Sequence, residues 1–107
     1  MNYRVEITDV AEQDILDIYY YISHHDSIEN ADHVITKLEN LCFSLNEQPT
    51  RGHVPPELDR IGIKEYLELH FKPYRVIYKI QNNTVIILCV ADGRRDMRSL
   101  LERRLIR

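Results

Sequence analysis

The sequence predicts an α+β fold with the element order β-α-α-β-β-β-(α), in which a helical hairpin packs on a small, mostly antiparallel sheet. Residues 66–91 read as three consecutive strands separated by short turn sequences. Residues 9–48 contain two amphipathic helical patterns in succession. A length of 107 residues, 44% of them hydrophobic, suits one domain over residues 1–107 with its own core.

Residues 3–7 open the pattern, because apolar and charged side chains alternate there as in a half-buried strand. Thr8 or Asp9 then caps a helix, since both side chains accept hydrogen bonds from the backbone of a first turn. The apolar residues that follow fall at helical spacing, and the helix is expected to end near His24–His25.

A second helix starts at Asp26 or Ser27 and carries a broad apolar stripe as far as Leu45. Gln48-Pro49 ends it, because a residue before proline is pushed out of the helical region. The short connection predicts an antiparallel hairpin with one face on the sheet. Residues 49–62 are rich in proline and glycine and are expected to form a loop.

The three later strands follow one another through tight turns. Residues 66–71 alternate, with Glu68 and His70 on the opposite face from the leucines, and Lys72-Pro73 makes a turn. Residues 74–80 alternate again before the hairpin turn at Asn82-Asn83. Residues 84–91 are apolar on both faces, which indicates a central strand covered on both sides. The first strand pairs either at the edge of the second strand or beside the fourth.

Residues 95–104 are amphipathic, with leucines and Met97 on one side. On the other side, arginines form either a basic binding face or a solvated face that pairs with Glu102. These arginines are Arg98, Arg103, Arg104 and Arg107.

Several protein classes are not expected. The longest apolar run, residues 85–91, is too short to cross a bilayer, and no signal peptide is recognised, so we expect a cytoplasmic protein without membrane contact. Cys42 and Cys89 lie in apolar surroundings and are expected to be buried thiols rather than a disulfide.

The formal net charge of −3 conceals a division along the chain. Residues 1–61 carry four basic and twelve acidic residues, a charge of −8, whereas residues 62–107 carry ten basic and five acidic residues, a charge of +5. This division predicts a dipolar surface that attracts an acidic partner to one side. The alternative is that the solvated faces differ only by chance.

No metal or cofactor site is expected. His24 and His25 are adjacent, a spacing that does not place two ligands on one helix face. His33, His53 and His70 are far apart in sequence, with no cysteine or carboxylate spacing that joins them. The chain has no phosphate-binding glycine motif, no serine nucleophile motif and no CxxC pair.

Three segments in this order resemble the RelE/ParE superfamily of type II toxin–antitoxin toxins, also called plasmid stabilisation proteins. They are RGHVPPEL at residues 51–58, YRVIY at 74–78 and DGRRD at 92–96. The resemblance covers the whole chain. It implies a cognate antitoxin encoded by the adjacent gene, and a higher oligomer of the complex in which the antitoxin, not this chain, contacts DNA.

The superfamily implies two activities. RelE-like toxins cleave mRNA on the ribosome with strand-two lysines, a strand-three arginine, an arginine after strand four and a tyrosine near the last helix. By this resemblance the two arginines match Arg75 and Arg95. The lysine positions fall at about Tyr66 and Glu68 and the tyrosine position at about Leu101, so the groups that would transfer protons are not kept. A pI of 5.9 also argues against docking into RNA.

The ParE-like branch, which poisons DNA gyrase without catalysis, is therefore favoured. A ribosome-dependent mRNA endonuclease using His70 or Asp92 as a base is the alternative, and a repurposed, non-toxic binding module is a third.

The residues expected to bind the target or antitoxin are Arg75, Arg94, Arg95, Arg98, Arg103 and Arg104. For Arg75 the competing interpretation is an ion pair with Glu68 on the neighbouring strand. For Arg94 and Arg95 it is a salt bridge to Asp96 or a solvated turn.

Overall fold

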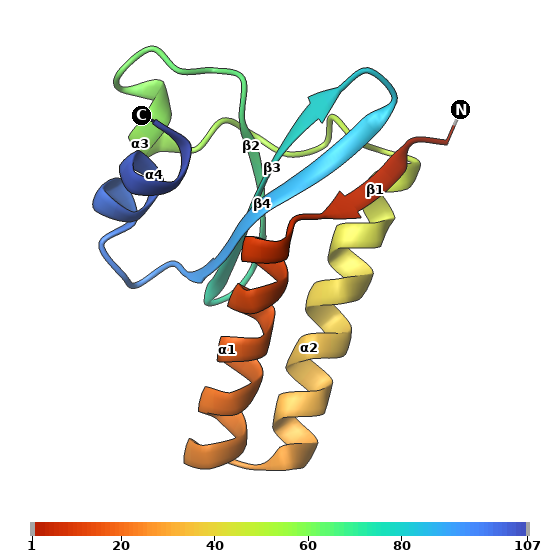
Figure 1. The fold of residues 1–107 in the computed structure, drawn as a ribbon, viewed down its shortest axis with the longest axis vertical. Coiled ribbons are helices and arrows are strands. Elements are labelled where there is room, and N and C mark those ends of the chain that lie inside the picture. Colours follow the sequence, from red (N-terminus) through yellow and green to blue (C-terminus); the bar gives the residue numbers. More distant parts are fainter. Residues whose placement is uncertain (1, 107) are drawn as a thin grey trace.

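A computed structural model describes residues 2–106 and contains a four-stranded sheet with helices on both faces (Figure 1). The element order confirms the predicted arrangement with two differences: the second helix ends at Phe43 and is followed by a short 3-10 helix, and another short helix interrupts the expected loop. The elements are β1 (Arg4–Ile7), α1 (Asp9–His25), α2 (Ile28–Phe43), the 3-10 helix η1 (Ser44–Asn46), α3 (Pro56–Asp59), β2 (Leu67–Phe71), β3 (Tyr74–Gln81), β4 (Thr84–Asp92) and α4 (Met97–Leu105).

The strand order is β1-β4-β3-β2. The two hairpins β2–β3 and β3–β4 are antiparallel as predicted, and Asn82 in the second turn has a positive φ of 57°. Sequence reasoning left two positions open for β1, and the structure places it beside β4 in parallel, with Arg4 opposite Thr84. Because β1 pairs only with the first half of β4, the second half has no strand on that side within the described residues.

The helical hairpin is capped at the expected positions. The side chain of Thr8 accepts a hydrogen bond from the Ala11 amide at 3.2 Å, and the side chain of Ser27 accepts one from the Asn30 amide at 3.0 Å. Helix α1 ends at His25, as predicted. The hairpin begins against β1 and β4, and its far end extends beyond the sheet (Figure 1).

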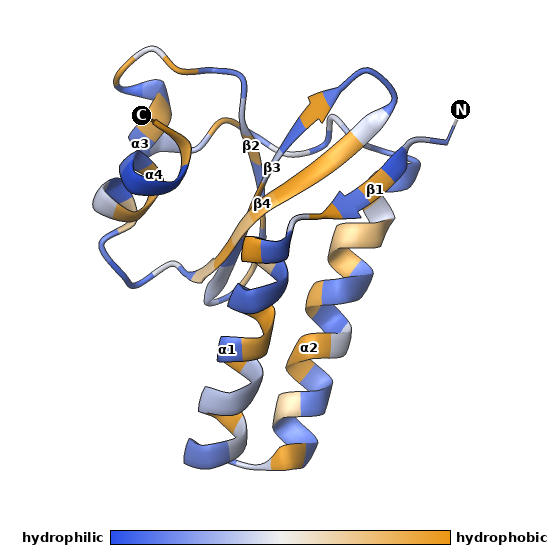
Figure 2. Ribbon diagram, viewed as in Figure 1, coloured by the Kyte–Doolittle hydropathy of each residue, from blue (hydrophilic) through white to orange (hydrophobic). Residues whose placement is uncertain are grey.

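Each face of the sheet has its own core. The hairpin buries Ala11, Leu38 and Tyr78, all 0% exposed, against one face. Helices α3 and α4 cover the other face, where Leu58 and Leu101 belong to a second apolar cluster. Figure 2 shows β4 as an almost continuous apolar strand between these layers, which confirms the predicted central strand.

Helix α3 shows that the prediction of a continuous loop over residues 49–62 was wrong. Pro56 occupies the first helical turn, where its missing N–H costs nothing and its fixed φ favours the helix. Leu58, 1% exposed, then packs into the second cluster beside α4.

Cys42 and Cys89 are free and buried, as predicted. Burial raises the pKa of the Cys42 thiol to about 12 and that of Cys89 to about 11, so both are unreactive. No helix in residues 2–106 combines the length and apolar character that a membrane span requires.

Candidate functional site

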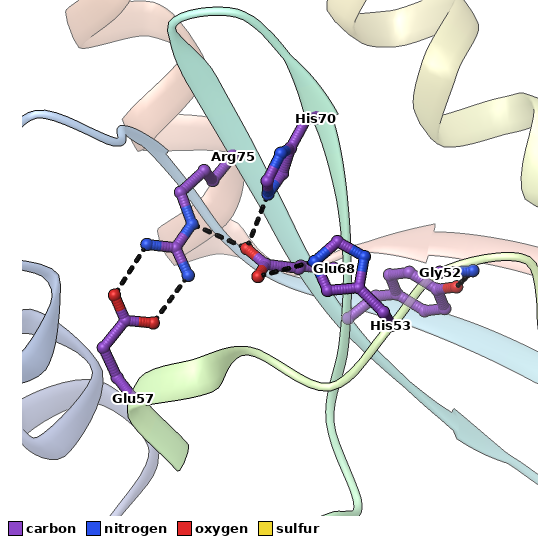
Figure 3. A network of polar contacts seen from close by, with 7 residues as sticks. Gly52, His53, Glu57, Glu68, His70 and Arg75 are labelled. Atoms are coloured by element: carbon purple, nitrogen blue, oxygen red, sulfur yellow. Dashed lines mark hydrogen bonds and ion pairs between the residues drawn. The ribbon is translucent and has the colours of Figure 1, made fainter. Parts of the chain in front are cut away.

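Arg75 is held by two carboxylates on the face of the sheet that α3 covers (Figure 3). Its Nε atom donates to Glu68 Oε1 at 2.6 Å, and its two terminal nitrogens donate to the Glu57 oxygens at 2.9 and 2.7 Å. The guanidinium is therefore bidentate toward Glu57, and its side chain is only 11% exposed. The ion pair with Glu68 that sequence reasoning offered as the competing interpretation is present.

Glu68 is fully buried and lies between two histidines. His70 Nε2 is 3.1 Å from Glu68 Oε1, and His53 Nε2 is 3.1 Å from Oε2. Neither approach has hydrogen-bond alignment, and Oε2 has no hydrogen-bond partner within the described residues. The expectation that no carboxylate joins His53 and His70 was wrong. The fold brings both histidines to Glu68, which lies fifteen residues after His53 and two residues before His70.

The loop that carries His53 is fixed to β2 by backbone contacts. The His53 amide donates to the Glu68 carbonyl at 3.2 Å, and the Glu68 amide donates to the His53 carbonyl at 2.8 Å. The Tyr78 hydroxyl donates to the Pro49 carbonyl at 2.7 Å and accepts from the Gly52 amide at 3.1 Å. A Cβ at Gly52 would lie 2.5 Å from that hydroxyl, so only glycine lets the loop approach so closely.

The charges in this cluster do not favour an anionic ligand. Hydrogen bonds from Arg75 lower the pKa of Glu57, and the same bonds raise the pKa of Arg75, so this pair stays ionised. With Glu68, two carboxylates surround one guanidinium and leave one excess negative charge. A phosphate would have to displace a bidentate carboxylate to reach Arg75.

Arg94 and Arg95 lie elsewhere, in a groove of about 320 Å³ between α1 and the ends of β3 and β4. Tyr21 and Tyr74 also line the groove. Arg94 Nε donates to Asp92 Oδ1 at 2.9 Å, and this guanidinium lowers the pKa of the carboxyl, which makes Asp92 a poorer base.

Asp96 does not pair with the arginines at this turn. Its side chain instead caps α4 by accepting from the Ser99 amide at 3.2 Å. Arg95 has no ion pair within residues 2–106, and its backbone amide donates to the Asp92 carbonyl.

The predicted basic face of α4 is divided by the packing. Arg104 points into the protein, where its Nη1 atom donates to Asp14 Oδ2 at 3.2 Å and to the Leu88 carbonyl at 3.3 Å. The same Asp14 oxygen accepts from the Val90 amide at 2.9 Å, so this pair covers the edge of β4 that β1 leaves free.

The other arginines of α4 remain at the surface. Arg98 lies 3.8 Å from Glu102 with 77% of its side chain exposed. Arg103 has no ion pair in the described part of the chain, and Arg107 lies outside the described residues.

Sequence reasoning missed Glu57 and His53, because both belong to the segment expected to be an irregular loop. One signal was present, namely the unusual placement of Glu68 and His70 on a strand with apolar neighbours. A charged residue at a covered strand position requires partners, and those partners had to come from outside the strand.

A family model described as the ParE toxin of the type II toxin–antitoxin system parDE matches residues 5–97. Three solved structures share the fold at low identity. The chromosomal ParDE TA system from P. aeruginosa has 15% identity and a TM-score of 0.71, covering 84% of this chain and 95% of that chain. The toxin–antitoxin complex RelBE2 from Mycobacterium tuberculosis has 21% identity and a TM-score of 0.64, with coverages of 86% and 92%.

A mutant of the E. coli toxin RelE in the free state has 13% identity and a TM-score of 0.66, with coverages of 98% and 100%. No curated protein matches the sequence.

Proposed function

Because the chain belongs to the ParE toxin family of type II toxin–antitoxin systems, we propose that it is a toxin that poisons DNA gyrase by binding, without catalysis. The family match also bears out the resemblance expected from the sequence motifs. Gyrase and the ribosome are both cytoplasmic, so the proposed function implies a cytoplasmic protein.

The observation that supports a non-catalytic toxin is the state of Arg75. An arginine that holds RNA phosphate must present free N–H groups in a positive environment. Here its Nε and both terminal nitrogens are bound to Glu57 and Glu68. The guanidinium therefore stabilises the fold, and the arginines left for a macromolecular partner are those outside this cluster.

We propose that the partner-binding surface comprises Arg94 and Arg95 in the groove and Arg98 and Arg103 on α4. The groove is lined by Tyr21 and Tyr74 and by Arg94 and Arg95, together with Asp14, Asp17 and Asp92. Asp92 and Asp14 are paired with Arg94 and Arg104, and Arg95, which has no ion pair within the described residues, is the cation left to meet an acidic, partly apolar segment. A cognate antitoxin segment that is disordered alone would fold onto this surface and neutralise the toxin. The solved ParDE system from P. aeruginosa and the RelBE2 toxin–antitoxin complex, which share this fold, support such a partner.

Purified protein, supercoiled plasmid and gyrase test the proposal directly. We expect inhibited supercoiling and accumulated cleavage complexes, and we expect the Arg94→Ala, Arg95→Ala double variant to lose at least tenfold in potency. Arg4→Ala is the matched control, since its side chain is 77% exposed and lies on β1, outside the groove. Unchanged gyrase activity at saturating wild-type protein would refute gyrase poisoning.

One observation favours the ribosome-dependent endonuclease as a second candidate. His70 Nε2 stands 3.1 Å from Glu68 Oε1 and the side chain is 42% exposed, so an imidazole beside a carboxylate is accessible to a substrate. Primer extension on transcripts after induction separates the two candidates. Discrete cleavage sites that disappear in His70→Gln would support the nuclease, and intact transcripts during growth arrest would exclude it.

Growth measurements test the third possibility, a repurposed module. Induction without the adjacent antitoxin gene is expected to stop growth, and co-expression of that gene is expected to restore it. Undiminished growth without the antitoxin would identify a non-toxic binding module.

A further inference from the structure

We propose that His53, Glu68 and His70 form a binding site for a divalent transition-metal ion of the zinc class. The set consists of two imidazole nitrogens and one carboxylate oxygen, which are the ligand types that zinc takes in three-ligand sites with one open position. One ligand atom from each residue lies within 4.8 Å of the other two. Nothing in the proposed toxin function requires such an ion.

Each imidazole nitrogen lies close to a carboxylate oxygen. Bonds of about 2.0–2.1 Å place neighbouring ligands of a tetrahedral ion about 3.3 Å apart. His53 Nε2 is 3.1 Å from Glu68 Oε2 and His70 Nε2 is 3.1 Å from Glu68 Oε1, so the two histidines approach different oxygens of the carboxylate at ligand-like separations. The imidazole rings are 5.2 Å apart at an interplanar angle of 76°, so they converge on the carboxylate from different directions, as ligands of one ion do.

The second observation is the state of the carboxylate. The Glu68 side chain is 1% exposed, yet its Oε2 atom has no hydrogen-bond partner within the described residues. A buried carboxylate oxygen without a partner is costly, and a cation there would satisfy it. Arg75 satisfies only the other oxygen of this carboxylate, since its Nε atom donates to Oε1 at 2.6 Å.

The surroundings also meet the requirements of a metal site. Arg75 hydrogen-bonds the ligating carboxylate and is itself neutralised by Glu57, which is the outer-shell support that metal ligands usually have. The cluster has one excess negative charge, so a divalent cation is not repelled. His53 and His70 are 60% and 42% exposed, so an ion can enter from solvent and keep a water molecule.

The backbone holds the ligands in place before any ion binds. Glu68 and His70 are two residues apart on β2, so their side chains share one face. His53 is fixed opposite Glu68 by the paired hydrogen bonds across the edge of β2, and Gly52 allows this close approach. An ion would therefore join the loop to the sheet, and it should raise the stability of the folded protein.

Equilibrium dialysis of the tag-free, full-length protein against zinc chloride tests the site. We expect one zinc per chain, with at least a tenfold loss of affinity in His53→Gln and in His70→Gln. His33→Gln is the matched control, because His33 is an exposed histidine on α2. We also expect the melting temperature of wild type to rise by on the order of 10 °C at a zinc concentration of 100 times Kd.

Two results would overturn the proposal. One is the absence of zinc binding in the folded wild-type protein, and the other is equal binding in all three variants. Histidine side-chain NMR of wild type covers the case in which the variants do not fold. Added zinc must shift the His53 and His70 imidazole signals, and a response confined to His24, His25 or His33 contradicts the assignment.

Discussion

Replacement of Arg75 by methionine should destabilise this protein strongly, although it removes no apolar contact of the side-chain stem. Arg75 is 11% exposed and compensates Glu68, which is 1% exposed, at 2.6 Å. Removing one member of a buried ion pair leaves the other charge without compensation. Such changes typically cost about 3–5 kcal/mol of unfolding free energy.

The structure places the expected cost near the lower end of that range. Glu57 is 20% exposed and can be solvated when its partner is lost, so most of the cost comes from Glu68. We therefore expect about 3 kcal/mol, which corresponds to a fall of roughly 12 °C or more in the melting temperature of a chain of this size.

Urea denaturation in the presence of EDTA measures this cost without interference from bound metal. Arg4→Met is the control, because Arg4 makes a comparable 2.8 Å ion pair with Glu6 at the surface and should lose less than about 1 kcal/mol. The Arg75→Met, Glu68→Gln double variant removes both charges and should recover about 1–3 kcal/mol relative to Arg75→Met alone. A cost of Arg75→Met no greater than that of Arg4→Met would refute the structural role of this guanidinium.

Three further changes follow from the same contacts. Glu57 has a pKa below its ordinary value of 4.5 in the folded protein. Its contribution to stability is therefore complete above pH 4.5 and is lost as the pH falls through the lowered pKa. Urea titrations between about pH 6 and pH 3 should show a steeper loss of unfolding free energy in wild type than in Glu57→Gln. Gly52→Ala should cost about 1–3 kcal/mol in the same denaturation assay, because the new Cβ meets Tyr78 Oη at 2.5 Å and the Glu68 carbonyl at 2.7 Å, whereas an unchanged midpoint would mean that the loop moves freely. Leu101→Ala should cost about 2–5 kcal/mol by calorimetry, and a smaller loss would show that α4 contributes little to the second core.

The periodic parts of this chain could be predicted from sequence because one face of each element is buried. The alternation of apolar and polar residues predicted β1, β2 and β3, and helical spacing predicted the hairpin. Of the two candidate caps of the first helix, Thr8 and Asp9, the structure shows Thr8. The position of β1 could not be derived in this way. A strand with two available edges carries no local signal that distinguishes them, and the choice depends on how α1 and α2 return the chain to the sheet.

The candidate sites were harder to predict, because side-chain partners come from segments without periodicity. His53 and Glu57 lie in the segment that was expected to be a loop, and their relation to Glu68 and Arg75 exists only after β2 and β3 pair. Arg94 and Arg95 were recognised from their place at a strand end, but Arg94 pairs with Asp92 rather than Asp96, and Arg95 has no ion pair within the described residues. The backbone amide of Arg94 also donates to Asp92 Oδ1, so the geometry of the turn favours Asp92 as the partner of Arg94.

The division of charge along the sequence is only partly a division in space. Asp14 and Glu57 belong to the acidic part of the chain, yet each forms an ion pair with an arginine of the basic part, Arg104 and Arg75 respectively. Steering of a partner depends on charges that remain exposed, since paired and buried charges contribute little field at the surface. Any attraction of an acidic segment must therefore come from exposed cations such as Arg95 and Lys72, and not from the number of basic residues in this half of the sequence.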